Sequence, residues 1–149
     1  MANRAAFTEA LLRDCRRLGP ARLVLRNGVG LSEVFVDLEK IDLQEGWAHV
    51  VLPSTHVHLT PGALGAVAFR TVCGGNGHHA PAIWLYGSEG APLVMIILDQ
   101  TTGEAAKTQS SRYREIAREF GPFMYLVSER EKPRPETVAP MTGGSVQLQ

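Results

Sequence analysis

Cysteine is scarce in this chain of 149 residues, which contains only Cys15 and Cys73. Two cysteines so far apart in sequence are too few for the disulfide framework that stabilises many small secreted domains. We therefore expect two reduced thiols and a cytoplasmic protein.

Long apolar runs are also missing. The longest, residues 92–98, is much shorter than the roughly 20 residues that a membrane-spanning helix needs. Charged residues scattered through positions 1–20 interrupt any apolar core of signal-peptide length. These absences predict a soluble protein that is not exported and has no membrane partner.

Neither sign of charge is in excess, because 15 lysine and arginine residues balance 15 aspartate and glutamate residues. Without a basic field to collect phosphates, nucleic acid is not an expected partner. A hydrophobic content of 44% over this length suits one folded domain. We place that domain at residues 1–127. Residues 128–149 are polar and poor in apolar side chains, so we expect a mobile tail there.

Two common functional patterns are absent as well. No Gly-x-Ser-x-Gly occurs, so the nucleophile turn of serine hydrolases is not predicted. The glycine-rich residues 74–77 precede a predicted strand, whereas a phosphate-binding loop leads into a helix. A zinc site is one open hypothesis, although its ligands would match no fixed zinc spacing. The candidates for that site are His56, His58, Cys73, His78 and His79.

The sequence does contain segments in which apolar and polar residues alternate, a pattern that is typical of half-buried strands. Apolar residues at helical spacing predict a helix over residues 5–18 and another from Ser110 or Ser111 to Phe120. The prediction is an α+β domain in which helices flank an antiparallel sheet of about seven to nine strands. The predicted strands are residues 21–26, 34–38, 41–43, 48–52, 56–59, 64–72, 82–86 and 93–98, with a hairpin turn at Asn27-Gly28.

His56 and His58 stand two residues apart within one predicted strand. Successive side chains on a strand point to opposite faces, so these two imidazoles share a face, with Cα atoms about 6.5 to 7 Å apart. Two imidazoles on one face are suited to holding a metal or a metallocofactor. The alternative is that His56 is only a surface residue.

Three segments together resemble one half of the bacterial haem-utilisation proteins of the HemS type, and their single-repeat relatives of the ChuX/HutX type. The first is residues 23–41, from Leu-Val-Leu-Arg-Asn to Asp-Leu-Glu-Lys-Ile. The second is residues 46–70, which contain Gly-Trp-Ala-His-Val-Val-Leu-Pro and then His-Val-His-Leu before an apolar strand. The third is the hairpin Ala-Ile-Trp-Leu-Tyr-Gly-Ser-Glu-Gly of residues 82–90, and a closing helix follows it.

The resemblance implies a protein that binds haem or a related tetrapyrrole in intracellular haem utilisation or trafficking. His58 falls on a position that is histidine in the single-repeat relatives and is implicated there in haem contact, so it is the expected iron ligand. Arg26 falls where those relatives can carry a second haem-facing histidine. An arginine cannot ligate iron, but its fork suits a propionate carboxylate. Arg70 stands where the family has a basic cluster, and His56 completes the candidate haem-binding set.

The resemblance also implies a C2 homodimer, because the longer proteins carry two copies of this unit that face each other. Two alternatives to a haem carrier stay open. One is an enzyme that breaks the haem ring, which needs an iron site open to oxygen. The other is a binding or assembly module that has kept the fold and lost the haem.

Overall fold

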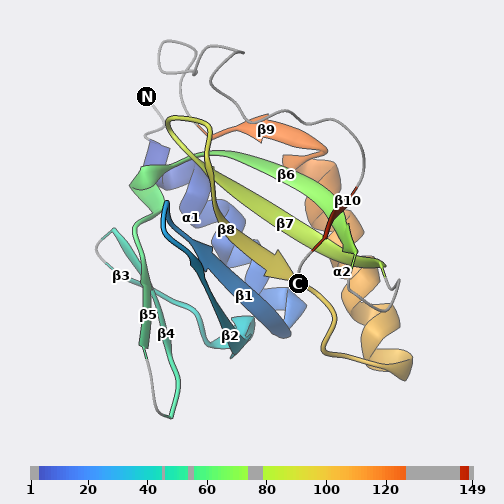
Figure 1. Ribbon diagram of the computed structural model, residues 1–149. Coiled ribbons are helices and arrows are strands. Elements are labelled where there is room, and N and C mark those ends of the chain that lie inside the picture. The colour runs from blue at the N-terminus through green and yellow to red at the C-terminus, as the bar shows by residue number, and fades with distance from the viewer. Residues whose placement is uncertain (1–3, 45, 54–55, 74–78, 127–144, 148–149) are drawn as a thin grey trace.

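The computed structural model describes residues 4–44, 46–53, 56–73, 79–126 and 145–147 (Figure 1). The predicted glycine loop at residues 74–77, His78 and most of the expected tail lie outside the described residues. Three residues of that tail, Ser145–Gln147, form a short strand, β10.

Ten strands of the described chain form two sheets, and the predicted α+β class with an antiparallel sheet is confirmed. The larger sheet has seven strands in the order β10-β6-β7-β8-β1-β2, and β9 pairs with β6 beside β10. Its neighbours are antiparallel except for β10, which runs parallel to β6. Its strands are β1 (Pro20–Arg26), β2 (Leu31–Asp37), β6 (Leu64–Cys73), β7 (His79–Gly87), β8 (Pro92–Ile97), β9 (Phe123–Tyr125) and β10.

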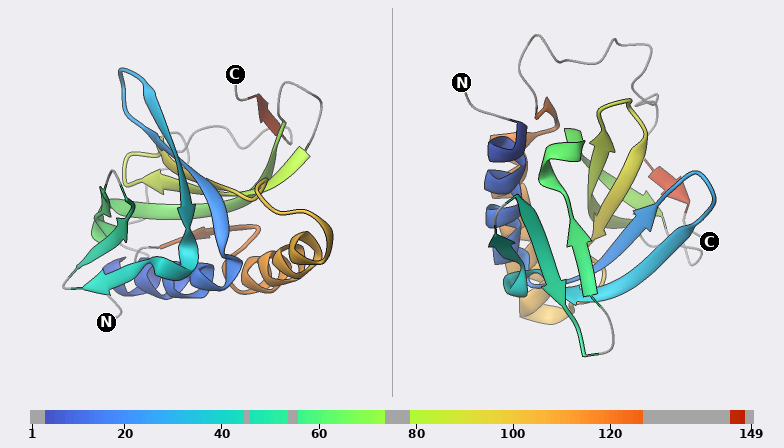
Figure 2. Two further views of the ribbon diagram at one scale, coloured as in Figure 1. Left: turned by 90° about the horizontal axis from the view of Figure 1, so that it is seen from below. Right: turned by 90° about the vertical axis from the view of Figure 1, so that its left-hand side faces the viewer.

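Two helices lie on one face of this sheet, as Figure 2 shows. They are α1 (Arg4–Cys15), which continues into the 3-10 turn η1 (Arg16–Leu18), and α2 (Gly103–Phe120). Helix α2 begins seven residues before the predicted Ser110, because its polar first turns carry little apolar signal. The core between helices and sheet includes Leu11, Leu12, Leu23, Ile83, Leu85, Ile96, Ile116 and Phe120.

The smaller sheet has three antiparallel strands in the order β3-β4-β5. They are β3 (Asp42–Gln44), β4 (Trp47–Val51) and β5 (His56–Leu59). Ala48, Val50 and Val57 are buried in the same core as the helices, while the residues that alternate with them face outward. The sheet is therefore fixed by burial on one side and leaves its other side to water.

The face of the larger sheet that points away from the helices, called the outer face below, carries a second apolar cluster. Trp84 and Tyr86 of β7 stack with ring centroids 6.4 Å apart, and the centroid of Phe123 of β9 lies 6.5 Å from that of Tyr86. Ala66 and Ala68 of β6 stand between these aromatic strands. Because alanine is small, rings two strands apart can meet across it.

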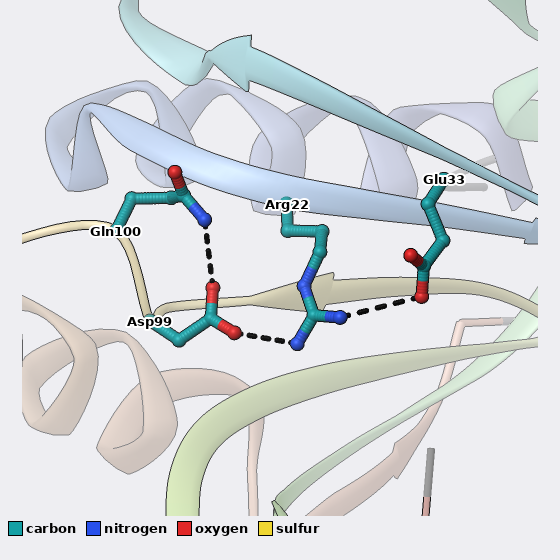
Figure 3. A network of polar contacts seen from close by, with 4 residues as sticks. All are labelled: Arg22, Glu33, Asp99 and Gln100. Atoms are coloured by element: carbon teal, nitrogen blue, oxygen red, sulfur yellow. Dashed lines mark hydrogen bonds and ion pairs between the residues drawn. The ribbon is translucent and has the colours of Figure 1, made fainter. Parts of the chain in front are cut away.

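An arginine ties three strands together on the outer face (Figure 3). Arg22 of β1 donates to Glu33 of β2 at 3.3 Å and to Asp99, just after β8, at 2.5 Å. Its side chain is 18% exposed, so these contacts are partly shielded from water. This network fixes the β1–β2 hairpin against the rest of the sheet.

A buried glutamine joins helix α2 to the start of β1. The side-chain Nε2 of Gln109 donates to the backbone oxygens of Leu18 and Pro20, each at 2.7 Å, and its Oε1 accepts from the Thr101 hydroxyl at 2.9 Å. Only 5% of this residue is exposed. The amide nitrogen of Gln109 thus makes two hydrogen bonds and its amide oxygen makes one, all inside the protein.

We predict that Gln109→Leu lowers the free energy of unfolding by about 2 to 4 kcal/mol, since two buried carbonyl oxygens lose their donor. Chemical denaturation measures this change. Thr108→Leu, at the neighbouring exposed position of α2, is the control and should change stability by less than about 0.5 kcal/mol. Equal effects of the two substitutions would contradict the assigned role of Gln109.

We predict that Arg22→Leu lowers the free energy of unfolding by about 1 kcal/mol, because the carboxylates of Glu33 and Asp99 lose the charged donor that links them. Hydrogen exchange should speed up in β2 more than in α2. The exposed Arg114→Leu is the control for loss of an arginine. Unchanged exchange in β2 would show that the network does not hold the hairpin.

Candidate functional site

The histidines gather on the outward side of the three-stranded sheet, called the histidine face below. His56 and His58 of β5 are exposed there, as the strand alternation predicts. Their rings stack with centroids 5.9 Å apart and planes at 29°. The adjacent strand β4 contributes Trp47 and His49 to the same face.

His49 is a further candidate residue on this face, which the sequence analysis missed. It lies directly opposite His58 in the β4–β5 register, and the two Nδ1 atoms are 2.6 Å apart. The rings are perpendicular, with centroids 4.6 Å apart. A partial signal was available, because residues 49 and 58 lie on two consecutive predicted strands joined by a short turn, and antiparallel hairpins bring such strands side by side.

Apolar surface borders the imidazoles. Trp47 is 47% exposed, and its ring centroid lies 6.4 Å from that of His58 in an edge-on arrangement. Val51, which is paired with His56, is 60% exposed. The exposed imidazole of His58 supplies a nitrogen ligand, and exposed Trp47 and Val51 supply apolar contact on the same face, so these residues fit a haem.

Arg26 and Arg70, the two predicted propionate partners, lie elsewhere, on the seven-stranded sheet. Alternation places both on the outer face, with Arg22 and Val24 on β1 and with Ala68 on β6. Arg26 is exposed at the end of β1. Arg26 and Arg70 thus share a face of the seven-stranded sheet, whereas His56 and His58 share a face of the three-stranded sheet.

Arg70 is held by a hydrogen bond to the Tyr86 hydroxyl. Burial raises the pKa of Tyr86 above its ordinary value of 10, and the charge and hydrogen bond of Arg70 pull the pKa part of the way back. Tyr86 is therefore a neutral phenol at physiological pH. Beside it, the buried Nε1 of Trp84 has no hydrogen-bond partner, which leaves an unused donor on the outer face.

The zinc hypothesis gains no support. Across the described ranges, no group of three or more His, Cys, Asp or Glu side chains is arranged to hold a metal ion. Cys73 and His79 pair across the β6–β7 ladder, away from the three-stranded sheet. Cys15 is a buried free thiol, and burial raises its pKa, so it is unreactive.

Two pockets of the described chain lie beside the helices. One, of about 440 Å³, is lined by Arg16, Arg17, Gly19, Glu39 and Arg112. The other, of about 490 Å³, lies between Phe69 and the end of α2. Neither contains a predicted site residue. None of the helices in the described ranges is long and apolar enough to cross a membrane.

Neither the family models nor the curated proteins contain a match to this chain. Solved structures do match. The haem-binding protein ChuX aligns with a TM-score of 0.55 and 12% identity over 72% of this chain and 71% of its own. Holo-PhuS, a haem-binding protein from Pseudomonas aeruginosa, aligns with a TM-score of 0.60 and 16% identity over 93% of this chain.

The haem-degrading enzyme ChuS of Escherichia coli O157:H7 aligns with a TM-score of 0.52 and 16% identity over 79% of this chain. This chain covers only 37% of PhuS and 34% of ChuS, whereas it covers most of ChuX. These proportions match one unit of the longer proteins. The chain therefore has the HemS/ChuX-like fold, as a single repeat unit.

Proposed function

We propose that this protein binds haem and carries it within the cell, with His58 as the iron ligand. The observation that supports this proposal most is the His58 imidazole itself. It faces solvent on strand β5, its Nδ1 is engaged by His49, and Trp47 lies beside it. Its Nε2 is thus the nitrogen left for iron. That ChuX and PhuS, which share the fold, are haem-binding proteins supports the same function.

The remaining candidate residues have separate roles in the proposed haem site. His56, stacked on His58, flanks the iron position and adds a second imidazole to the contact surface. Arg26 and Arg70 supply positive charge for the two propionate carboxylates, and Arg70 is held in place by Tyr86. Haem brings the redox-active iron, while the protein binds it, orients it and limits its access to water.

A C2 homodimer is part of the proposal, because the histidines and the arginines lie on different sheets of one protomer. A second copy could bring its arginine-bearing outer face toward the histidine face of the first. The edge strand β2 supports association, since Leu31 and Phe35 on it are 52% and 64% exposed. Val29 in the adjoining turn is 98% exposed.

We predict that hemin titration of the wild-type protein gives a saturable shift of the Soret band. His58→Ala should weaken binding by more than about tenfold, because the iron loses its protein ligand. His79→Ala, which removes an exposed histidine from a different sheet, is the matched control and should bind hemin as the wild type does. An unsaturable wild-type titration would exclude haem binding, and an unchanged His58→Ala titration would exclude His58 as the ligand.

Ascorbate added to the hemin complex separates a carrier from a haem-degrading enzyme. A carrier keeps its Soret band, which shifts as the iron is reduced. Loss of the band with a biliverdin-like product would replace the carrier proposal with the enzyme.

A further inference from the structure

The short contact between His49 and His58 has a chemical requirement. Two ring nitrogens 2.6 Å apart form a hydrogen bond only when one carries a proton and the other offers a lone pair. Each neutral imidazole has one protonated nitrogen. A ring whose Nδ1 carries the proton therefore has a lone pair on Nε2, and a ring whose Nδ1 accepts has its proton on Nε2. One of the two histidines therefore exposes an Nε2 lone pair, and the other exposes an Nε2–H.

We infer that His49 is a positioning residue that holds His58 in the tautomer able to ligate iron. In this arrangement His58 donates its Nδ1–H to the Nδ1 of His49. The Nε2 of His58 then presents its lone pair to the iron. This inference rests on the proposed haem function for its purpose, although the tautomer itself is a property of the haem-free protein.

The neighbour on the other side of His49 favours this direction of the hydrogen bond. Asp42 of β3 is paired with His49, which is paired with His58, so the three residues form one row across the sheet. The Nε2 of His49 lies on the ring edge opposite its Nδ1 and is the nitrogen that does not contact His58. A carboxylate in the same row, whose Oδ2 also accepts from the Gln44 amide at 2.6 Å, favours a proton on that nitrogen, which leaves the Nδ1 of His49 as the acceptor.

The consequence for bound iron follows from the same hydrogen bond. A ligating imidazole that donates its second N–H has its ring orientation fixed and its basicity raised. The perpendicular rings of the pair, at 90°, allow the Nδ1–H of His58 to point at the lone pair in the plane of His49. His56 lies equally near His58 but stacks on it at 29°, so it supplies no such in-plane acceptor.

Nitrogen-15 NMR of the haem-free protein tests the tautomers without any ligand. We expect the Nδ1–H form for His58 and the Nε2–H form for His49 at neutral pH. His49→Val should return His58 to the mixture of tautomers of a free imidazole. Finding His58 as the Nε2–H form in the wild type would overturn the inference, whatever the protein does with haem.

Hemin-loaded variants test the consequence for iron. His49→Val should weaken hemin binding by about tenfold, lower the frequency of the ferrous iron–histidine stretch and raise the reduction potential. His49→Asn, whose amide oxygen stands where Nδ1 stood, should restore all three toward the wild type. His79→Val is the control.

The outcomes separate the two proposals. A wild-type protein that binds no hemin would end the proposed function, while the NMR result would still decide the tautomer. If the wild type binds hemin, but its iron–histidine stretching frequency and its reduction potential equal those of His49→Val, only the role of His49 is overturned. Loss of binding in His49→Asn as severe as in His58→Ala would make His49 itself the ligand, which also contradicts the inference.

Discussion

The strand register of the three-stranded sheet is the constraint on which the candidate site depends. Ala48, Val50 and Val57 are buried against the helical core, so β4 and β5 cannot slip by one residue without bringing apolar side chains to the surface. The residues that alternate with them must then face water. This burial holds His49 and His58 opposite each other, although neither histidine is part of the core.

The seven-stranded sheet complements that site in a different way. Both of its faces carry apolar clusters, one beneath the helices and one on the outer face. Two of the charges on the outer face are balanced or bound, Arg22 by two carboxylates and Arg70 by Tyr86. In the proposed dimer, this face and its arginines are what a second copy turns toward the propionates of a haem held at His58.

The sequence predicts the architecture better than it predicts the site. Alternation and turn dipeptides identify most strands, and the shared face of His56 and His58 follows from their spacing alone. Two features need information beyond local periodicity. Arg26 and Arg70 share a face because of the register of the β1–β8, β8–β7 and β7–β6 ladders, which the sequence alone does not give. The short strand β9 was missed because its pairing with β6 is a tertiary contact of only three residues.

The central claim is that the iron of a bound haem lies at His58. Anomalous diffraction at the iron absorption edge, from crystals of the hemin-loaded protein, locates the metal directly. The account predicts an iron peak about 2 Å from the Nε2 of His58. An iron peak over Trp84 on the outer face, with His58 unligated, would contradict it.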